Sequence, residues 1–190
     1  MKQTSKIFSI AFYNQKPVLV DIETITSGGM YRFEILGLNQ KNATTLKQKI
    51  YTALRSGHLL NLKSDNRKIY TSIQSDVDID NAQPSELAIL TSCYNCITKK
   101  NFHENSIILG KISISGEVLP TNILTQSIHL AIDRDIKTII CPEVDFNKIE
   151  KRVLDTAYSM GIFIYKISDI QELFTLKKEN PSNTCPPETH

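Results

Sequence analysis

Ser85 has a setting in this sequence that would suit a nucleophile. It follows Pro84, a residue favoured in the first turn of a helix, so its hydroxyl is expected at a helix N-terminus. The partial positive charge there stabilises a developing anion. A serine becomes nucleophilic only when a base lies within hydrogen-bond reach, for example a lysine amine kept neutral by burial. Without such a base, the simpler interpretation is a solvated or capping serine.

The cysteines are the next candidates for chemistry. The chain has four, and Cys93 and Cys96 form a C-x-x-C pair. That pair falls inside a helical pattern, and no second pair or nearby histidine completes a zinc set. We therefore expect free thiols that are buried or half-buried.

Histidines and acidic residues show no metal-binding spacing. His58 follows a predicted helix end, His103 lies in a loop and His129 lies on a helix. The alternating aspartates of SDVDIDN, at 75–81, could hold a divalent cation weakly, but no glycine or terminal glutamate completes a calcium loop. The sequence therefore predicts a solvated acidic loop, no metal site and no cofactor.

A nucleotide-binding loop is also missing. Its G-x-x-x-x-G-K-[ST] pattern places backbone amides around phosphates. The chain contains one Gly-Lys pair, Gly110-Lys111, which has Asn105 at the position of the first glycine and Ile112 after the lysine. The pair also falls in a predicted strand, so ATP binding by this motif is not expected.

Composition indicates an ordinary globular chain. Of 190 residues, 41% are hydrophobic and 22% charged, which is enough apolar material for a core. The net charge of +2, without a run of Lys or Arg, does not match a dedicated nucleic-acid binder, although weak or partner-assisted binding stays open. No signal peptide or membrane-spanning stretch is evident, so we expect a cytoplasmic protein that does not bind membranes.

Apolar periodicity divides the chain into strands and helices. Strands are predicted at 6–13, 16–25, 31–36, 68–75, 106–115, 137–141 and 162–166. Asn14-Gln15 is expected as a hairpin turn and Gly116-Glu117 as a second turn. The single helix of the first part and the strand–helix alternation of the second predict an α/β sandwich with a mixed sheet.

Helix ends are predicted from capping residues. We expect one helix from Asn42 to Gly57, one beginning at Pro84, and one capped by Thr121 or Asn122. The buried stripe of the second is expected to be Leu87, Leu90, Tyr94 and Ile97. Two more are expected, one from the cap Asp145 to Gly161 and a short one with a Ser168–Gln171 capping box. The polar, proline-rich residues 177–190 are expected to be a disordered tail after a single domain at 1–176.

Three blocks of sequence resemble a known family. They are SGGMYRFEILGL with LKQKIYTALRSG at 27–38 and 46–57, LGKISISGEVLP at 109–120, and IKTIICP at 136–142. They resemble the N-terminal domain of magnesium-chelatase-like proteins of the ComM type (ChlI-like), which is related to the Lon proteolytic domain and the RadA C-terminal domain. The resemblance implies a fold like ribosomal protein S5 domain 2, a sandwich containing a left-handed βαβ unit. It also implies turn-shaping roles for these residues: Gly37, Leu38, Gly110, Gly116, Glu117 and Pro120.

The Lon-type resemblance also assigns two dyad positions. The serine falls on Ser85, but the lysine position falls on Thr125, whose hydroxyl is far too weak a base near neutral pH. Asn122-Ile123 replaces a glycine pair, and Glu86 stands where a small residue is usual. We call Ser85 and Thr125 the vestigial dyad positions.

These departures predict a non-catalytic domain that lacks the AAA+ ATPase module. By resemblance, its role would be assembly or accessory work in DNA uptake, recombination or repair. Its partner would be a ring-forming AAA+ ATPase or another copy of the chain, with DNA as a further option. One alternative is a degenerate Lon-like serine peptidase in which Lys111 or Lys137 serves Ser85. Another is the remnant of a split or truncated gene.

Overall fold

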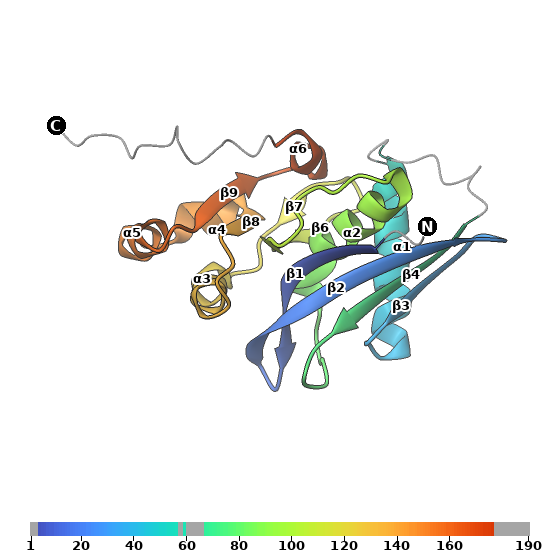
Figure 1. The fold of residues 1–190 in the computed structure, drawn as a ribbon, viewed down its shortest axis with the longest axis horizontal. Helices are drawn as coiled ribbons and strands as arrows, with labels where there is room; N and C mark the ends of the chain where they lie inside the picture. The colour runs from blue at the N-terminus through green and yellow to red at the C-terminus, as the bar shows by residue number, and fades with distance from the viewer. Residues whose placement is uncertain (1–3, 57–58, 60–66, 177–190) are drawn as a thin grey trace.

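The computed structural model describes residues 4–56, 59 and 67–176. Its main feature is a seven-stranded mixed sheet with the order β3-β4-β2-β1-β5-β8-β9 (Figure 1). Helices pack against this sheet, and a separate two-stranded sheet is formed by β6 and β7. The predicted α/β class with a mixed sheet is therefore confirmed. The predicted tail at 177–190 and the helix end at Gly57 lie outside the described residues.

The first half of the sheet begins with a long hairpin. β1 (Thr4–Tyr13) pairs antiparallel with β2 (Lys16–Gly28), and both turn residues, Asn14 and Gln15, have positive φ angles of 48° and 63°. Two positive φ angles define a type I′ turn, whose twist matches the twist of the strands. The predicted hairpin is confirmed. β4 (Arg67–Gln74) adds antiparallel to β2, and β3 (Arg32–Leu36) adds parallel to β4.

Helix α1 (Gln40–Ser56) crosses between β3 and β4 and begins earlier than predicted. The backbone N–H of Asn42 donates to the side chain of Asn39 at 2.9 Å, so Asn39 takes the capping role that we expected of Asn42. Both asparagines suit a cap, and the local sequence did not distinguish between them.

Helix α2 (Glu86–Thr98) is the central helix and follows a 3-10 turn, Gln83–Ser85. Of the predicted stripe, Leu87, Leu90 and Ile97 are buried and Tyr94 is half-buried. Burial extends well beyond the stripe, since eleven of the thirteen residues are buried. The helix contacts β1, β2 and β4 of the sheet and also α1. On its α6 side, the ring of Tyr94 lies 4.0 Å from that of Phe174. A helix that is covered on all sides needs apolar or hydrogen-bonded side chains around its whole circumference. Its sequence therefore shows a weaker apolar stripe than the sequence of a surface helix.

The predicted strand at 106–115 is divided between two sheets. β5 (Ile107–Ile108) lies between β1 and β8, whereas β6 (Lys111–Ile112) pairs with β7 (Val118–Leu119). The division falls at Gly110, whose backbone N–H donates to the carbonyl oxygen of Pro84 at 2.9 Å rather than to a strand.

The second half alternates strands and helices. Its elements are α3 (Leu124–Asp133), β8 (Thr138–Pro142), α4 (Glu143–Lys148), α5 (Lys151–Ser159), β9 (Phe163–Ile167) and α6 (Ile170–Thr175). The single helix predicted from Asp145 is instead two, because Ile149 and Glu150 are extended between them, with ψ angles of 144° and 136°. The predicted Ser168–Gln171 capping box was also wrong, since Asp169 caps α6 by accepting the N–H of Gln171 at 2.8 Å.

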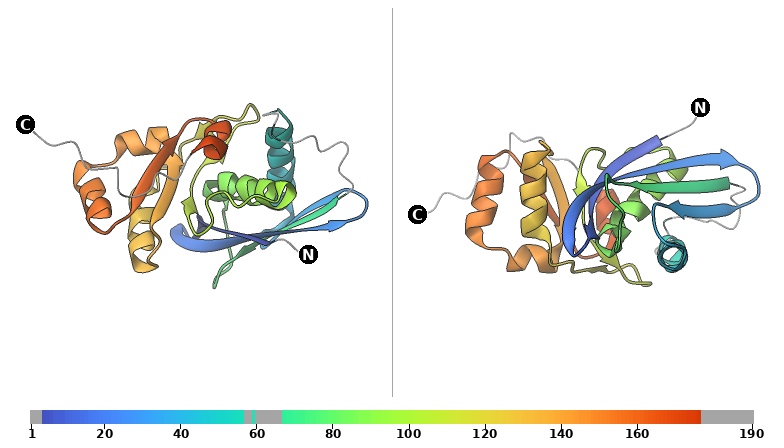
Figure 2. Two further views of the ribbon diagram at one scale, coloured as in Figure 1. Left: turned by 45° about the horizontal axis from the view of Figure 1, so that its top comes forward. Right: turned by 90° about the horizontal axis from the view of Figure 1, so that it is seen from below.

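The strands of the sheet contribute to two cores on its opposite faces. On β8, Ile140 belongs to the core shared with α1, α2 and α6, whereas Ile139 belongs to the core shared with α3 and α5. This alternation follows from the two-residue period of a strand. Figure 2 shows the helices distributed accordingly, with α3 and α5 grouped at the β8–β9 end. No helix in the described part of the chain is long and apolar enough to cross a membrane.

Candidate functional site

Ser85 lies in the interior. Its side chain has no solvent exposure, and its Oγ donates to the carbonyl oxygen of Ile10 in β1 at 2.8 Å. Its backbone N–H donates to the carbonyl oxygen of Ala82 at 3.0 Å, and its side chain does not cap α2. Within the described residues, Ile10 is the only hydrogen-bond partner of the Ser85 hydroxyl. The interpretation of Ser85 as a solvated or capping serine was therefore wrong.

Glu86, the residue after Ser85, is a buried carboxylate with two partners. Its Oε2 lies 2.6 Å from Nζ of Lys49 in α1 and accepts the backbone N–H of Ile112 at 2.8 Å. One oxygen thereby joins α1, α2 and β6. A buried carboxylate needs such partners, because an unpaired charge is costly away from water. The sequence showed only that a small residue was missing here, and nothing local indicated Lys49 as its partner.

Gly110 completes the surroundings of the Pro84-Ser85 step. Its N–H donates to Pro84, and its carbonyl oxygen accepts the N–H of Leu87 at 3.0 Å. A Cβ at this position would lie 2.9 Å from Cγ1 of Val118 and 3.1 Å from Cδ2 of Leu87, and φ is +153°. Glycine is therefore required for the backbone of residue 110 to approach the start of α2 this closely.

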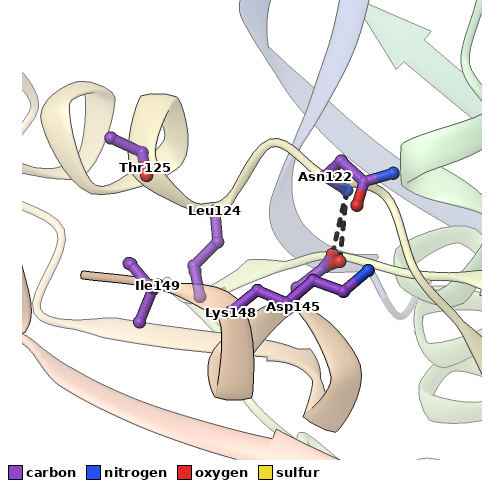
Figure 3. Close-up of a pocket in the computed structure, with 6 residues that line it drawn as sticks. All are labelled: Asn122, Leu124, Thr125, Asp145, Lys148 and Ile149. Carbon is purple, nitrogen blue, oxygen red and sulfur yellow. Dashed lines mark hydrogen bonds between the residues drawn. The ribbon is translucent and has the colours of Figure 1, made fainter.

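Thr125 lies in a different environment, in the first turn of α3 at the surface. It lines a pocket of about 170 Å³ with Asn122, Leu124, Asp145, Lys148 and Ile149. Figure 3 shows that α3, the loop before it, α4 and the residue after α4 supply these side chains. Ser85 does not line this pocket. The structure thus does not bring the two vestigial dyad positions into one pocket.

Asp145 organises the loop beside Thr125. Its buried carboxylate accepts the N–H of Thr121 at 2.8 Å, the hydroxyl of Thr121 at 2.6 Å and the N–H of Asn122 at 3.2 Å (Figure 3). Asp145 was expected to cap its own helix, and Thr121 or Asn122 was expected to cap α3. Both expectations were wrong: the carboxylate on α4 satisfies the amides before α3, while α3 has no side-chain cap of its own. Local propensity cannot reveal this partnership across 24 positions.

The two lysines considered as substitute bases lie on separate elements. Lys137 is half exposed and forms an ion pair with Asp135 at 2.6 Å, and its amine also donates to the carbonyl oxygen of Met160 at 3.3 Å. Lys111 is half-buried on β6, opposite Leu119. Lys148, which sequence reasoning missed, is the lysine that shares a pocket with Thr125.

The remaining turn residues lie around the sheet edges. A Cβ on Gly37, with φ at +91°, would lie 2.1 Å from the carbonyl oxygen of Ile73, so only glycine fits there. Leu38 is half-buried against the α1 core. The carbonyl oxygen of Gly116 accepts the N–H of Ile170 at 3.0 Å. Glu117 is exposed, and Pro120 is half-buried before α3.

The described thiols and histidines lie in separate parts of the fold. Cys93, Cys96 and Cys141 are buried, and burial raises the pKa of Cys93 and of Cys141 to about 12. His103 is buried with Nε2 2.6 Å from the carbonyl oxygen of Leu173, whereas His129 is exposed on α3. His58 and Cys185 lie outside the described residues.

The aspartates of the 75–81 loop are at the surface. Asp76, Asp78 and Asp80 are exposed, and a carboxylate oxygen of Asp80 accepts the N–H of Asn14. In the part of the chain that the structure describes, no three His, Cys, Asp or Glu side chains are placed to hold a metal ion.

This arrangement defines a mixed α/β domain in which Ser85 is buried in the interior and Thr125 is exposed beside a surface pocket. Residues 22–145 match the family described as subunit ChlI of Mg-chelatase, and the chain belongs to this family. Lon protease of Buchnera aphidicola subsp. Schizaphis graminum is 21% identical over 187 residues, 95% of this chain and 23% of that protein. DNA repair protein RadA of Rickettsia felis is 30% identical over 115 residues, 60% of this chain and 23% of that protein.

A second Lon protease, from Haemophilus influenzae, is 23% identical over 173 residues, which is 86% of this chain and 20% of that protein. The chain thus spans about a quarter or less of the curated relatives that it matches. The distant similarity to Lon protease and RadA that the sequence blocks indicated is confirmed.

Proposed function

We propose that this chain is a non-catalytic ChlI-type domain that works by docking, as an assembly or accessory protein in DNA processing. Its partner would be a ring-forming AAA+ ATPase or further copies of the chain. We also propose that its sandwich is of the ribosomal protein S5 domain 2 type. In support of that fold, β3 and β4 are parallel neighbours joined through α1.

The buried hydrogen bond of Ser85 carries the non-catalytic part of the proposal. A nucleophilic hydroxyl must reach a substrate carbonyl and transfer its proton to a base. The Ser85 Oγ has no solvent exposure and donates its proton to the carbonyl oxygen of Ile10, which is not a base. The Glu86 carboxylate beside it is already bonded to Lys49 and Ile112.

The DNA-processing part of the proposal is supported by the relatives alone. One of them is named a DNA repair protein, and the others are Lon proteases. The net charge of +2 gives no strong electrostatic attraction to DNA, so contact through a partner is the better-supported mode.

A serine-reactive fluorophosphonate probe tests the non-catalytic part. We expect no labelling of the wild-type chain and none of Thr125→Lys, because restoring a lysine at 125 does not expose Ser85. A serine–lysine protease serves as the positive control. Labelling of the wild-type chain that disappears in Ser85→Ala would overturn this part in favour of the degenerate peptidase.

Docking is tested by light scattering of the chain alone and after mixing with a ring-forming AAA+ ATPase from the same cell, with and without ATP. A larger complex, or a stable ring of the chain itself, is expected. A strict monomer that binds neither the ATPase nor DNA would overturn the docking role.

A further inference from the structure

β3 is an edge strand with one open side. Among the described strands it pairs with β4 alone, from Arg32 opposite Lys68 to Leu36 opposite Ser72. Figure 1 shows it beside α1, at the end of the sheet away from β9. Since backbone groups of a strand alternate in direction, one set of N–H and C=O groups of β3 points outward, where another strand could pair with it.

The outer side of this edge carries both charged and apolar side chains. Arg32, Glu34 and Leu36 alternate along the solvent side of β3; Leu36, the last residue of the strand, is 54% exposed, and Met30, just before the strand, is 84% exposed. A shallow groove of about 370 Å³ runs beside the edge, between β3 and α1, and its lining includes Tyr31, Tyr51 and Lys47. The segment 30–36 contains no proline or lysine, and its two charged residues are of opposite sign, so they do not repel a second copy as a single-sign edge would.

The order of charges on β3 is self-complementary in one register. If a second copy of β3 approaches antiparallel about a two-fold axis at Phe33, Arg32 lies opposite Glu34 of the second copy. The symmetry produces this charge pair twice. Leu36, the last residue of β3, comes opposite position 30 of the second copy, where an exposed methionine precedes the strand. Cross-strand pairs of opposite charge are stabilising.

Neighbouring registers lose this complementarity. An axis at Glu34 places two glutamates opposite each other, and an axis at Arg32 places two arginines opposite each other. Like charges directly opposite are destabilising. A shift of the pairing by one residue would set Glu34 against the inward-facing Phe33 of the other copy, since side chains alternate between faces.

We propose that β3 pairs antiparallel with β3 of a second copy about a two-fold axis at Phe33, which joins the two seven-stranded sheets at this edge. Two existing contacts must adjust: the Arg32–Glu34 bond of 3.0 Å and the Lys47–Glu34 contact of 3.6 Å. Both involve partly exposed side chains, and exposed ion pairs contribute little, so a cross-copy partner can replace them.

This inference names the surface and the symmetry of the self-association that the proposed function allows. It rests on the proposed function only in assuming that the chain self-associates. The serine probe and mixing with the ATPase test other surfaces, so a negative result in either does not bear on β3 pairing. Light scattering of the chain alone does bear on it: a chain that stays monomeric alone but binds the ATPase contradicts the β3 pairing and leaves the docking role in place.

Charge reversal tests the register by sedimentation velocity over a range of protein concentrations. The wild-type chain should dimerise, and both Arg32→Glu and Glu34→Arg should dimerise at least tenfold more weakly, because each creates two like-charge contacts across the axis. An equimolar mixture of the two variants should dimerise like the wild type, since every 32–34 contact in that heterodimer joins opposite charges. An ion pair formed within one chain cannot produce this rescue, because each variant by itself carries like charges at positions 32 and 34.

Lys166→Glu is the matched control. Lys166 lies on β9, the opposite edge of the sheet, in a similarly exposed pair with Glu143 at 2.8 Å, and its reversal should leave dimerisation unchanged. Thermal unfolding of each variant verifies that it folds. A wild-type chain that stays monomeric at several hundred micromolar, or a mixture that does not rescue the two variants, would overturn the proposal.

Discussion

The surroundings of Ser85 and of Thr125 differ in how their polar groups are used. Around Ser85 the polar side chains are buried and bonded to distant elements: Ser85 to Ile10, and Glu86 to Lys49. Thr125 is exposed and lines an open pocket whose shape is set by the buried carboxylate of Asp145.

The contrast shows that the two positions which would act together in a serine–lysine dyad can have different structural roles in this chain. The serine side is part of the core, where each buried polar group requires a partner. The region around Thr125 lies at the surface, and the carboxylate of Asp145 is the buried hydrogen-bond acceptor beneath it. Substitutions of the polar residues at the serine side should therefore change stability, whereas at the threonine side a substitution of Asp145 should do so and one of the exposed Thr125 should not.

Asp145→Ala should produce the largest effect. It leaves the N–H and hydroxyl of Thr121 and the N–H of Asn122 without their acceptor, and we expect a loss of about 3 kcal/mol in the free energy of unfolding, since bonds to charged acceptors are the stronger ones. Urea unfolding measures it. Asp155→Ala, which removes an exposed aspartate on α5, is the control and should change stability by less than about 0.5 kcal/mol. Equal effects of the two substitutions would show that the Asp145 bonds do not hold the loop.

Ser85→Ala should cost about 1 kcal/mol, the typical contribution of one buried hydrogen bond. Its matched control is Ser127→Ala, because Ser127 is equally buried but bonds to Ile123 within its own helix at 2.8 Å. That local bond adds no link between elements, and alanine is the better helix former, so the control should be nearly neutral. If the two variants unfold at the same urea concentration, the Ser85–Ile10 bond does not help to hold β1 against α2.

The smallest effect on stability is expected from the thiols of Cys93 and Cys141. Each thiol also reports whether its part of the molecule opens locally. Burial raises the pKa of both from 9.0 to about 12, so the folded protein keeps them protonated where the unfolded chain loses the proton. Their contribution to stability is therefore complete below about pH 9 and is lost as the pH rises toward 12. Iodoacetamide at pH 8 should label neither thiol in the folded protein and both in guanidinium chloride. Rapid labelling of either one under native conditions would show that its side of the molecule opens locally.

The sequence predicted much of the fold where local signals act alone. The Asn14-Gln15 turn and the flanking strands follow from turn chemistry and apolar alternation, and both are confirmed. The strand at 106–115 and the helix from Asp145 were predicted as single elements and are each divided. In both cases the apolar pattern continues across the break. At Gly110 the backbone turns to bond with Pro84, which is distant in the sequence, whereas at Ile149 and Glu150 it becomes extended for two residues.

The candidate site was predicted only in part. Ser85 and Thr125 could be named from the resemblance, and the missing lysine is a fact of the sequence. The bonds that characterise each position could not be named, because Glu86 meets Lys49 across 37 positions and Asp145 meets Thr121 across 24.

The sequence by itself determined the chemistry that is available: no lysine at 125, no nucleotide-binding loop, a β3 segment with alternating charges, and glycine at 37 and 110. The tertiary structure alone decided how these residues are used. It buried Ser85 against Ile10, which is 75 positions away, and it placed β3 at the edge of the sheet. The physical reason is that burial and hydrogen-bond pairing depend on which elements pack together, and a single sequence position carries no record of its distant neighbours.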